Sequence, residues 1–277
     1  MDGRRLIRRR SARACWPGRQ TAASAIMIVS LTASMAHSGL KSVEREIVSC
    51  RLCPRLVGHR ERVARVKARR FAGETYWGRP VPALGDVGAR LVVIGLAPAA
   101  HGGNRTGRMF TGDRSGDWLY EALHRFGFAN QATSVDRNDG LELRDTFVTA
   151  AARCAPPGNK PTREELLRCR PYLLAELRLL TRMRVAIALG RIAFDVFFRA
   201  WEELGHTIAR PRPRFEHGGA LDLDGGILLL ASYHPSQQNT FTGKLTRSMF
   251  HQVFRKARHA LDVSQPTARS RGKERAR

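Results

Sequence analysis

Residues 91–113 read LVVIGLAPAAHGGNRTGRMFTGD, a continuous apolar run that breaks into a glycine-rich loop. A strand whose apolar residues do not alternate with polar ones is typical of a parallel sheet covered on both faces. Two more apolar runs follow, at 185–189 and 227–231, and residues 146–149 are β-branched and aromatic, which also favours a strand. Helical patterns fall between them, and strands alternating with helices indicate an α/β fold. The sequence therefore predicts an α/β sandwich with a mainly parallel sheet.

Helices are expected between and after these strands. Residues 116–126 and 190–201 each place their apolar side chains on one face. Thr162 and Glu165 form a capping box that opens a third helix, which Pro171 should kink or restart. A last helix is expected at 244–261, and no internal repeat or second domain boundary is visible.

The chain is strongly basic. Its 277 residues carry 48 Lys and Arg against 24 Asp and Glu, a formal net charge of +24. Residues 1–20 hold a net +6 and residues 263–277 a net +4, so +14 remains on residues 21–262. Since 43% of the residues are hydrophobic, a collagen-like or wholly disordered chain is excluded. A basic globular body favours a polyanionic partner, of which nucleic acid is the commonest.

Four of the five cysteines lie in this body. Two residues separate Cys50 from Cys53, and Cys154 and Cys169 follow much later in the chain. Four thiolates arranged in two pairs can close a site for structural zinc or for an iron–sulfur cluster. Buried structural cysteines or two disulfides are the alternatives. The spacing alone does not choose the metal.

The loop at 95–113 contains five glycines, so its backbone can approach a ligand closely. Phe110 in this loop is placed to stack on a flat base, and Asp113 to orient a water molecule. The alternatives are that Phe110 fills the core and that Asp113 caps the helix beginning near Gly116.

Two further loops follow strands, at the edge where parallel sheets bind ligands. In residues 154–161, Asn159 offers donors and an acceptor to a base edge, or simply turns the chain. Residues 234–239, HPSQQN, place His234 after the last strand, beside polar residues suited to a DNA groove. A lone histidine is more often structural, but this position favours a role in the site.

Taken together, these strings resemble family 5, or type b, of the uracil-DNA glycosylase superfamily. The loop at 95–113 resembles that family's first active-site motif, HPSQQN its second, and the four cysteines its iron–sulfur ligands. The similarity runs from about Cys50 to Leu261. It implies a three-layer α/β/α sandwich with a four-stranded parallel sheet and one [4Fe-4S] cluster. It also implies excision of uracil, and of other deaminated bases such as hypoxanthine, from double-stranded DNA.

The resemblance also implies roles for single residues. His234 would donate a hydrogen bond to the departing base, and Asp113 would stabilise the sugar cation and position the water. Phe110 and Asn159 would bind the base, together with Gly95 and Ala97. Contacts with DNA are expected from Arg105, Ser236, Gln237, Gln238 and Asn239, and phosphate contacts also from Arg108, Lys160, Lys244 and Arg247.

Three departures from related families bear on these roles. Leu96 stands where several relatives have a polar catalytic residue, which moves water activation to Asp113. Ala150 stands where relatives place a uracil-reading asparagine, which implies a roomier pocket and draws attention to Asn159. Gln237 and Gln238 replace the leucine wedge of some relatives.

Two other classes stay open at this point. A non-catalytic DNA-damage-binding protein, stabilised by zinc or an iron–sulfur cluster, would bind uracil-containing DNA without producing abasic sites, and Leu96 with Ala150 keeps this alternative alive. A zinc-dependent nuclease is less favoured because no cluster of carboxylates or histidines supplies an open catalytic metal site.

The N-terminal segment has the pattern of an export signal, because an arginine-rich start precedes an apolar run at 25–31 and small residues at 33–36. The run is too short to span a membrane. The alternative, an extension from a start upstream of the natural one, fits DNA chemistry inside the cell. We expect residues 1–40 to be disordered or non-native, 41–262 to form the glycosylase domain, and 263–277 to be a disordered basic tail. The expected protein is a cytoplasmic, nucleoid-associated monomer.

Overall fold

The computed structural model describes residues 22–263, with side chains from Met35 onward. Within this range the strands are β1 (Leu84–Gly85), β2 (Leu91–Gly95), β3 (Thr146–Ala150), β4 (Val185–Leu189), β5 (Ala220–Leu223) and β6 (Ile227–Ser232). The α-helices are α1 (Ala22–Ser49), α2 (Pro54–Val66), α3 (Gly103–Thr106), α4 (Arg114–Arg125), α5 (Arg163–Leu179), α6 (Arg191–Glu203), α7 (Gln237–Phe241) and α8 (Arg247–Val263). Short 3₁₀ turns are η1 (Arg69–Phe71), η2 (Pro157–Asn159) and η3 (Asp224–Gly226).

The strands form one sheet in the order β1-β3-β2-β4-β6-β5. The four central strands run parallel, and these are the four strands predicted from the sequence. Strands β1 and β5 pair antiparallel at the two edges. Neither edge strand was predicted, because β1 is two residues long and β5 carries exposed residues at alternate positions.

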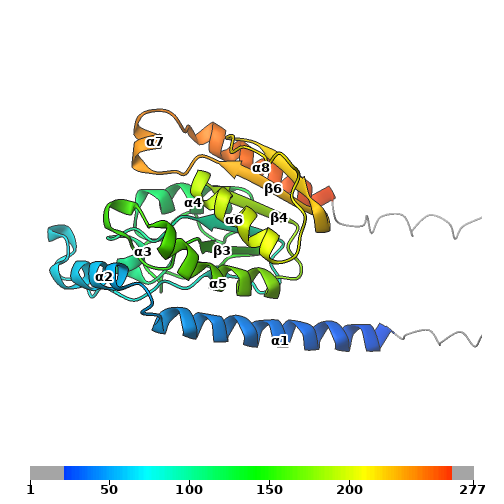
Figure 1. The fold of residues 1–277 in the computed structure, drawn as a ribbon, viewed down its shortest axis with the longest axis horizontal. Coiled ribbons are helices and arrows are strands. Elements are labelled where there is room, and N and C mark those ends of the chain that lie inside the picture. Colours follow the sequence, from blue (N-terminus) through cyan, green and yellow to red (C-terminus); the bar gives the residue numbers. More distant parts are fainter. Residues whose placement is uncertain (1–21, 264–277) are drawn as a thin grey trace, which may run out of the picture.

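Helices cover both faces of the sheet (Figure 1). Leu91 and Val93 of β2 pack in a cluster with residues of α4 and α8. Val92 and Ile94 point to the opposite face and pack with residues of α5 and α6. Successive strand residues point to opposite faces, so a strand that is apolar throughout contributes to two cores. The expected three-layer α/β/α sandwich is confirmed.

The predicted helices are present as α4, α5, α6 and α8. Thr162 and Glu165 form both bonds of the predicted capping box at the start of α5. The helix continues through Pro171 rather than restarting there, and because Pro171 is exposed the carbonyl that loses its bond can turn to solvent. Helix α8 begins at Arg247, three residues later than predicted.

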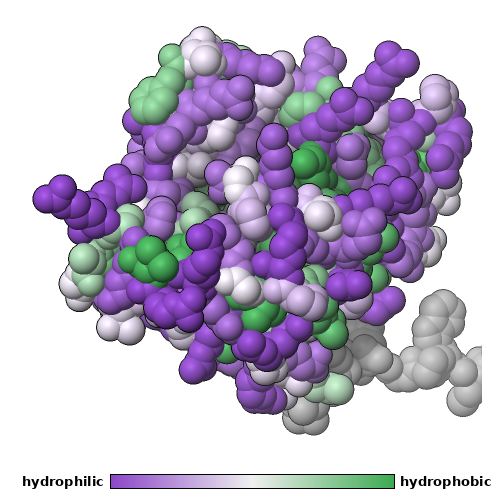
Figure 2. Space-filling view, turned by 60° about the vertical axis from the view of Figure 1, so that its left-hand side comes forward, coloured by the Kyte–Doolittle hydropathy of each residue, from purple (hydrophilic) through white to green (hydrophobic). Residues whose placement is uncertain are grey.

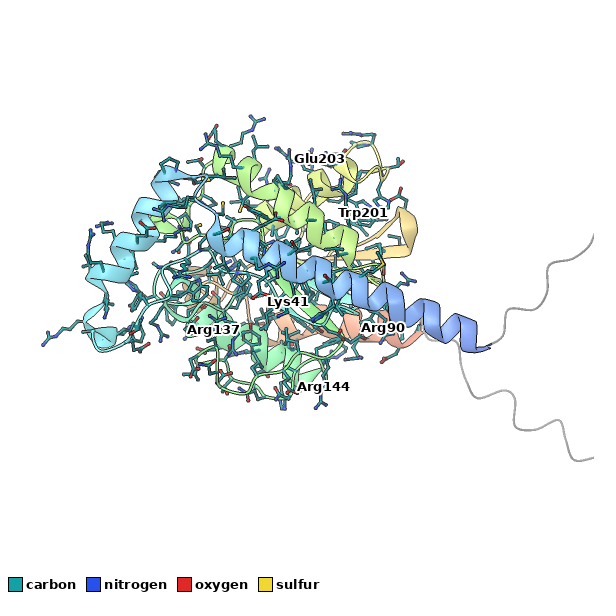
Figure 3. All side chains as sticks on the ribbon, turned by 90° about the horizontal axis from the view of Figure 1, so that it is seen from below. Lys41, Arg90, Arg137, Arg144, Trp201 and Glu203 are labelled. Atoms are coloured by element: carbon teal, nitrogen blue, oxygen red, sulfur yellow. The ribbon has the colours of Figure 1, made fainter. Side chains whose placement is uncertain are left out.

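The N-terminal helix α1 lies across the outside of α5, as the view from below shows (Figure 3). A Cβ at Gly39 would lie 2.8 Å from a methyl carbon of Leu179, so the two helices pack closely there. Residues 22–40 are therefore helical, which differs from the expected disorder, while 1–21 and 264–277 lie outside the described residues. No helix in the described part of the chain has the length and apolar character needed to cross a membrane.

Candidate active site

Phe110 is held in the glycine-rich loop by close approaches that only glycine permits. A Cβ at Gly95 would lie 2.5 Å from the Phe110 ring, and one at Gly116 would lie 1.8 Å from the Phe110 carbonyl oxygen. Phe110 also has a φ of 53°, which is uncommon for a bulky residue. The surrounding loop therefore fixes this ring against the carboxyl end of β2.

His234 faces Phe110 from the loop after β6. The two ring centroids are 6.0 Å apart, with 28° between the ring planes. The Asn239 side chain donates to the His234 carbonyl oxygen at 2.8 Å and fixes the loop. Within the described residues the imidazole nitrogens make no hydrogen bond, and burial lowers the pKa of His234 to about 4. The imidazole is thus neutral near pH 7 and free to bond a ligand.

Asp113 lies at the N-terminus of α4, three residues after Phe110. Its Oδ1 accepts a hydrogen bond from the Gly116 amide at 3.0 Å, so the predicted capping role is confirmed. A Cβ at Gly102 would lie 2.0 Å from Asp113 Oδ2, so the carboxylate packs directly on that glycine. Burial raises the pKa of Asp113 to about 6, against the opposing effect of the Gly116 and Ser115 amides. Capping leaves the second carboxylate oxygen for other chemistry.

Nonpolar side chains occupy the two nearby positions, Leu96 and Ala150, at which relatives were expected to have polar ones. Ala150 is buried and pairs with Gly95 across the parallel strands. The Leu96 carbonyl oxygen accepts from the Ala152 amide at 2.9 Å, which joins the loops after β2 and β3. Ala97 is half-buried in the same loop. No polar side chain from these positions reaches the site.

Asn159 lies apart from this group. It is exposed on η2, with a φ of 57°. Its side chain makes no hydrogen bond within the described residues, and no contact there joins it to Phe110 or His234. Its role in base binding stays a prediction.

The predicted DNA-binding residues divide into two groups. Gln237 and Gln238 are exposed on α7, whereas Ser236 caps that helix and Asn239 holds the His234 loop. Arg105 corrects the prediction, because it is 8% exposed and is ion-paired with Glu74.

Arg105 also donates to the carbonyl oxygens of His101 and Gly112, so it ties the loop together instead of facing DNA. Arg108 is buried as well and bonds Asp139 and Ser134, each at 2.6 Å. Both arginines stabilise the loop that carries Phe110.

The four predicted cysteines line one small cavity, whose walls also include Leu56, Pro80 and Tyr172. All four are free thiols. Burial raises the pKa of Cys154 to about 11 and that of Cys169 to about 12. No group of His, Cys, Asp or Glu side chains in residues 35–263 is arranged to hold a metal ion as it stands. The prediction that these four thiols lie together is confirmed.

Two buried arginines beside this cavity were not predicted. Arg60 is 2% exposed, and its Nη1 donates to Cys154 Sγ at 3.2 Å. Arg153 is 1% exposed, pairs with Glu176 at 2.6 Å, and donates its backbone amide to Cys169 Sγ at 3.3 Å. Nitrogens of both guanidinium groups lack partners within the described residues. The adjacency of Arg153 to Cys154 was the only sequence signal for this arrangement.

Comparison with known proteins supports the resemblance identified from the sequence. Residues 82–258 match the family model described as the uracil DNA glycosylase superfamily. The chain is 54% identical over 215 residues to a type-5 uracil-DNA glycosylase of Mycobacterium bovis, covering 77% of this chain and 79% of the relative. Similar proteins of the same description occur in Mycobacterium leprae (52% over 225 residues, 81% and 96%) and Thermus thermophilus (51% over 213 residues, 76% and 94%).

Proposed function

Because the chain belongs to the uracil-DNA glycosylase superfamily, we propose that it is a uracil-DNA glycosylase that hydrolyses the bond between uracil and deoxyribose in double-stranded DNA. It acts as a monofunctional enzyme, leaving an abasic site and starting base excision repair. One observation carries the proposal: Phe110 and His234 face each other across the ends of β2 and β6, with Asp113 following Phe110.

Reaction begins with extrusion of the nucleotide, since the glycosidic bond is inaccessible inside a duplex. Extrusion costs a few kcal/mol and is least costly for a mispaired base, which favours uracil opposite guanine. The extruded base stacks on Phe110, whose ring the close approach of Gly95 holds in one orientation. Phe110 is 8% exposed and also packs in the core cluster with residues of β2 and α4, so the ring is held in place before the base arrives.

Bond cleavage leaves negative charge on the base and positive charge on the sugar. His234 is neutral, so it donates a hydrogen bond to the base without holding a competing anion in the free enzyme. Asp113 is mostly ionised above its pKa of about 6, so it stabilises the sugar cation and orients the attacking water. Each such group contributes about 10²- to 10³-fold to the rate.

The substrate range extends beyond uracil. Leu96 and Ala150 place no polar side chain against the base, which supports acceptance of other deaminated bases such as hypoxanthine. Asn159 is the remaining candidate for hydrogen bonding to the polar edge of the base, and its exposed position requires the loop to close on DNA.

The same proposal includes one [4Fe-4S] cluster held by Cys50, Cys53, Cys154 and Cys169, with zinc as the alternative. A single zinc ion needs its four ligands about 2.3 Å from one point, whereas a cluster spreads them over four irons. The four free thiols around one small cavity support a metal group held there. The role of the cluster would be structural, because it would join the segment before α2, the loop after β3 and helix α5.

The test uses a labelled duplex with one uracil opposite guanine, incubated with the protein in chelator without magnesium and then treated with alkali. Cleavage only after alkali is expected. Cleavage without alkali would contradict a monofunctional enzyme. Tight binding without any cleavage would instead support a non-catalytic damage-binding protein.

A further inference from the structure

The C-terminal half of α2 and the turn that follows it form a strongly basic segment. Residues 62–70 read RVARVKARR, with five basic residues and no acidic residue. We call this segment the basic arm. Arg62, Arg65, Arg69 and Arg70 are exposed, and none of them forms an ion pair with a carboxylate in the described part of the chain.

The nearby acidic residues are already engaged. Glu61 pairs with Arg51 at 2.5 Å, and Glu74 pairs with Arg105. Arg62 and Arg65 are three residues apart on a helix and therefore share one face, where like charges repel. A segment with this repulsion and no counter-charge is suited to an external polyanion.

The arm is fixed beside the active-site loop. The buried Asn104 side chain, in α3, donates to the Arg60 carbonyl oxygen of α2 at 3.2 Å. Beyond the arm, the Tyr76 hydroxyl lies 3.0 Å from His101 Nδ1 in the glycine-rich loop. The chain around the arm is thus bonded to the loop that carries Phe110 and Asp113.

The arm also lies at the end of the molecule that carries the candidate active site. Figure 1 shows α2, α3 and α7 at the same end, and α3 and α7 follow the carboxyl ends of β2 and β6. With that side turned forward, the surface is largely hydrophilic and its apolar side chains are scattered (Figure 2). Such a surface fits a polar, charged ligand better than an apolar protein partner.

Positive potential extends from the arm to the loop. The pKa of His59 is lowered by burial and then by Arg62 and Arg55. The pKa of His101 is lowered by burial and then by Arg70 and Arg105. The arginines of the arm are therefore close enough to act on groups at the edge of the active-site loop.

We propose that the basic arm binds the phosphate backbone of duplex DNA beside the extruded nucleotide. This deepens the proposed function and rests on it for the nature of the substrate. Arg62, Arg65, Arg69 and Arg70 meet phosphates, while exposed α7 approaches the DNA from the other side of His234. Arg105 and Arg108, which are buried, take no part in this contact.

The test compares two triple variants with the same loss of charge. The first, Arg62→Gln/Arg65→Gln/Arg69→Gln, removes charge from the arm. Binding to a labelled duplex without uracil is measured by fluorescence anisotropy over a range of salt concentrations. The slope of log Kd against log salt should fall by about one for each arginine that meets a phosphate, with at least a tenfold loss of affinity at low salt.

The matched control changes three exposed arginines toward the amino ends of the parallel strands, opposite the end that carries the arm. These are Arg178, Arg182 and Arg199, none of which forms an ion pair within the described residues. The control triple, each Arg→Gln, should change Kd by less than about twofold. Equal losses in both triples would show diffuse attraction and overturn the proposal, as would an arm triple that binds like the wild type.

Excision is measured separately, under single-turnover conditions. The arm triple should need more enzyme for half-maximal rate but reach the wild-type rate at saturation, because the arm does not touch the reacting atoms. If the wild type binds DNA without excising uracil, the proposed function fails while the binding comparison still decides the arm. If the wild type excises uracil and the arm triple binds normally, only the arm is refuted.

Discussion

The candidate active site and the cysteine cavity lie at the same end of the sheet, but their buried ionisable groups are of different types. In the active site, burial lowers the pKa of His234 to about 4 and raises that of Asp113 to about 6. Both shifts favour the neutral form. Beside the cavity lie two arginines, Arg60 and Arg153, which are 2% and 1% exposed.

The difference follows from the residue types. Histidine and aspartate can lose their charge by exchanging a proton, whereas arginine stays protonated at any accessible pH. The active site is therefore adjustable by pH. The cavity holds permanent cations that are incompletely bonded within the described residues, and an anionic group bound by the thiolates would satisfy them.

Replacing Asp113 should produce the largest effect. Asp113→Asn retains a good helix cap, so the free energy of unfolding should change little. It removes the carboxylate charge, so the single-turnover rate of uracil excision should fall by about 10²- to 10³-fold. DNA affinity should stay within about twofold. A variant with wild-type turnover would remove Asp113 from the mechanism.

The pH dependence tests the same carboxylate without mutation. Only ionised Asp113 stabilises the sugar cation, so the single-turnover rate should rise with pH through about 6 and then level off. At pH 5 it should be about a tenth of its plateau. His234 stays neutral over this range, so no second inflection is expected between pH 5 and 8.

Acid unfolding driven by Asp113 would not explain the lower excision rate at low pH. Its pKa is raised in the folded protein, so this group stabilises the fold most at low pH and loses that contribution as pH rises through 6. Circular dichroism at each pH checks that the fold persists. An inflection that survives in Asp113→Asn would assign the titration to another group.

The central sheet was predictable because its four parallel strands are buried on both faces and consist almost wholly of apolar, β-branched or aromatic residues. The edge strands β1 and β5 were not, since pairing with β3 and β6 holds them rather than any pattern of their own. The candidate site residues Phe110, Asp113 and His234 were recognisable because they lie in loops that follow strands.

The direction of a charged side chain was harder to predict. Arg105 was expected to face DNA, but it is 8% exposed and pairs with Glu74, 31 residues earlier. Arg60 was not singled out, and its burial depends on Cys154, 94 residues later. Partners this distant in the chain leave no local pattern, whereas the exposed arm at 62–70 is recognisable once the fold separates inward from outward arginines.

The cavity is tested by Cys154→Ser, for which we expect a smaller effect on function. Visible absorbance and bound iron in the purified protein should both fall, because one ligand of the proposed cluster is lost. Since Cys53 is the N-cap of α2, whose C-terminal half belongs to the basic arm, DNA affinity should fall by about three- to tenfold through the salt-dependent term. Full iron content would show that Cys154 is not a required ligand. Iron loss without any change in affinity would separate the cavity from DNA binding.

The smallest effect on DNA binding is expected for Arg105→Gln, and it separates structural from DNA-binding arginines. Arg105 donates to Glu74 and to the carbonyl oxygens of His101 and Gly112, so its loss leaves acceptors unpaired. The free energy of unfolding should fall by about 1–3 kcal/mol. DNA affinity and its salt slope should stay close to the wild type at a temperature where the variant is folded. A reduced slope without loss of stability would instead place Arg105 on the DNA, and the distinction between buried and exposed arginines drawn here would be wrong.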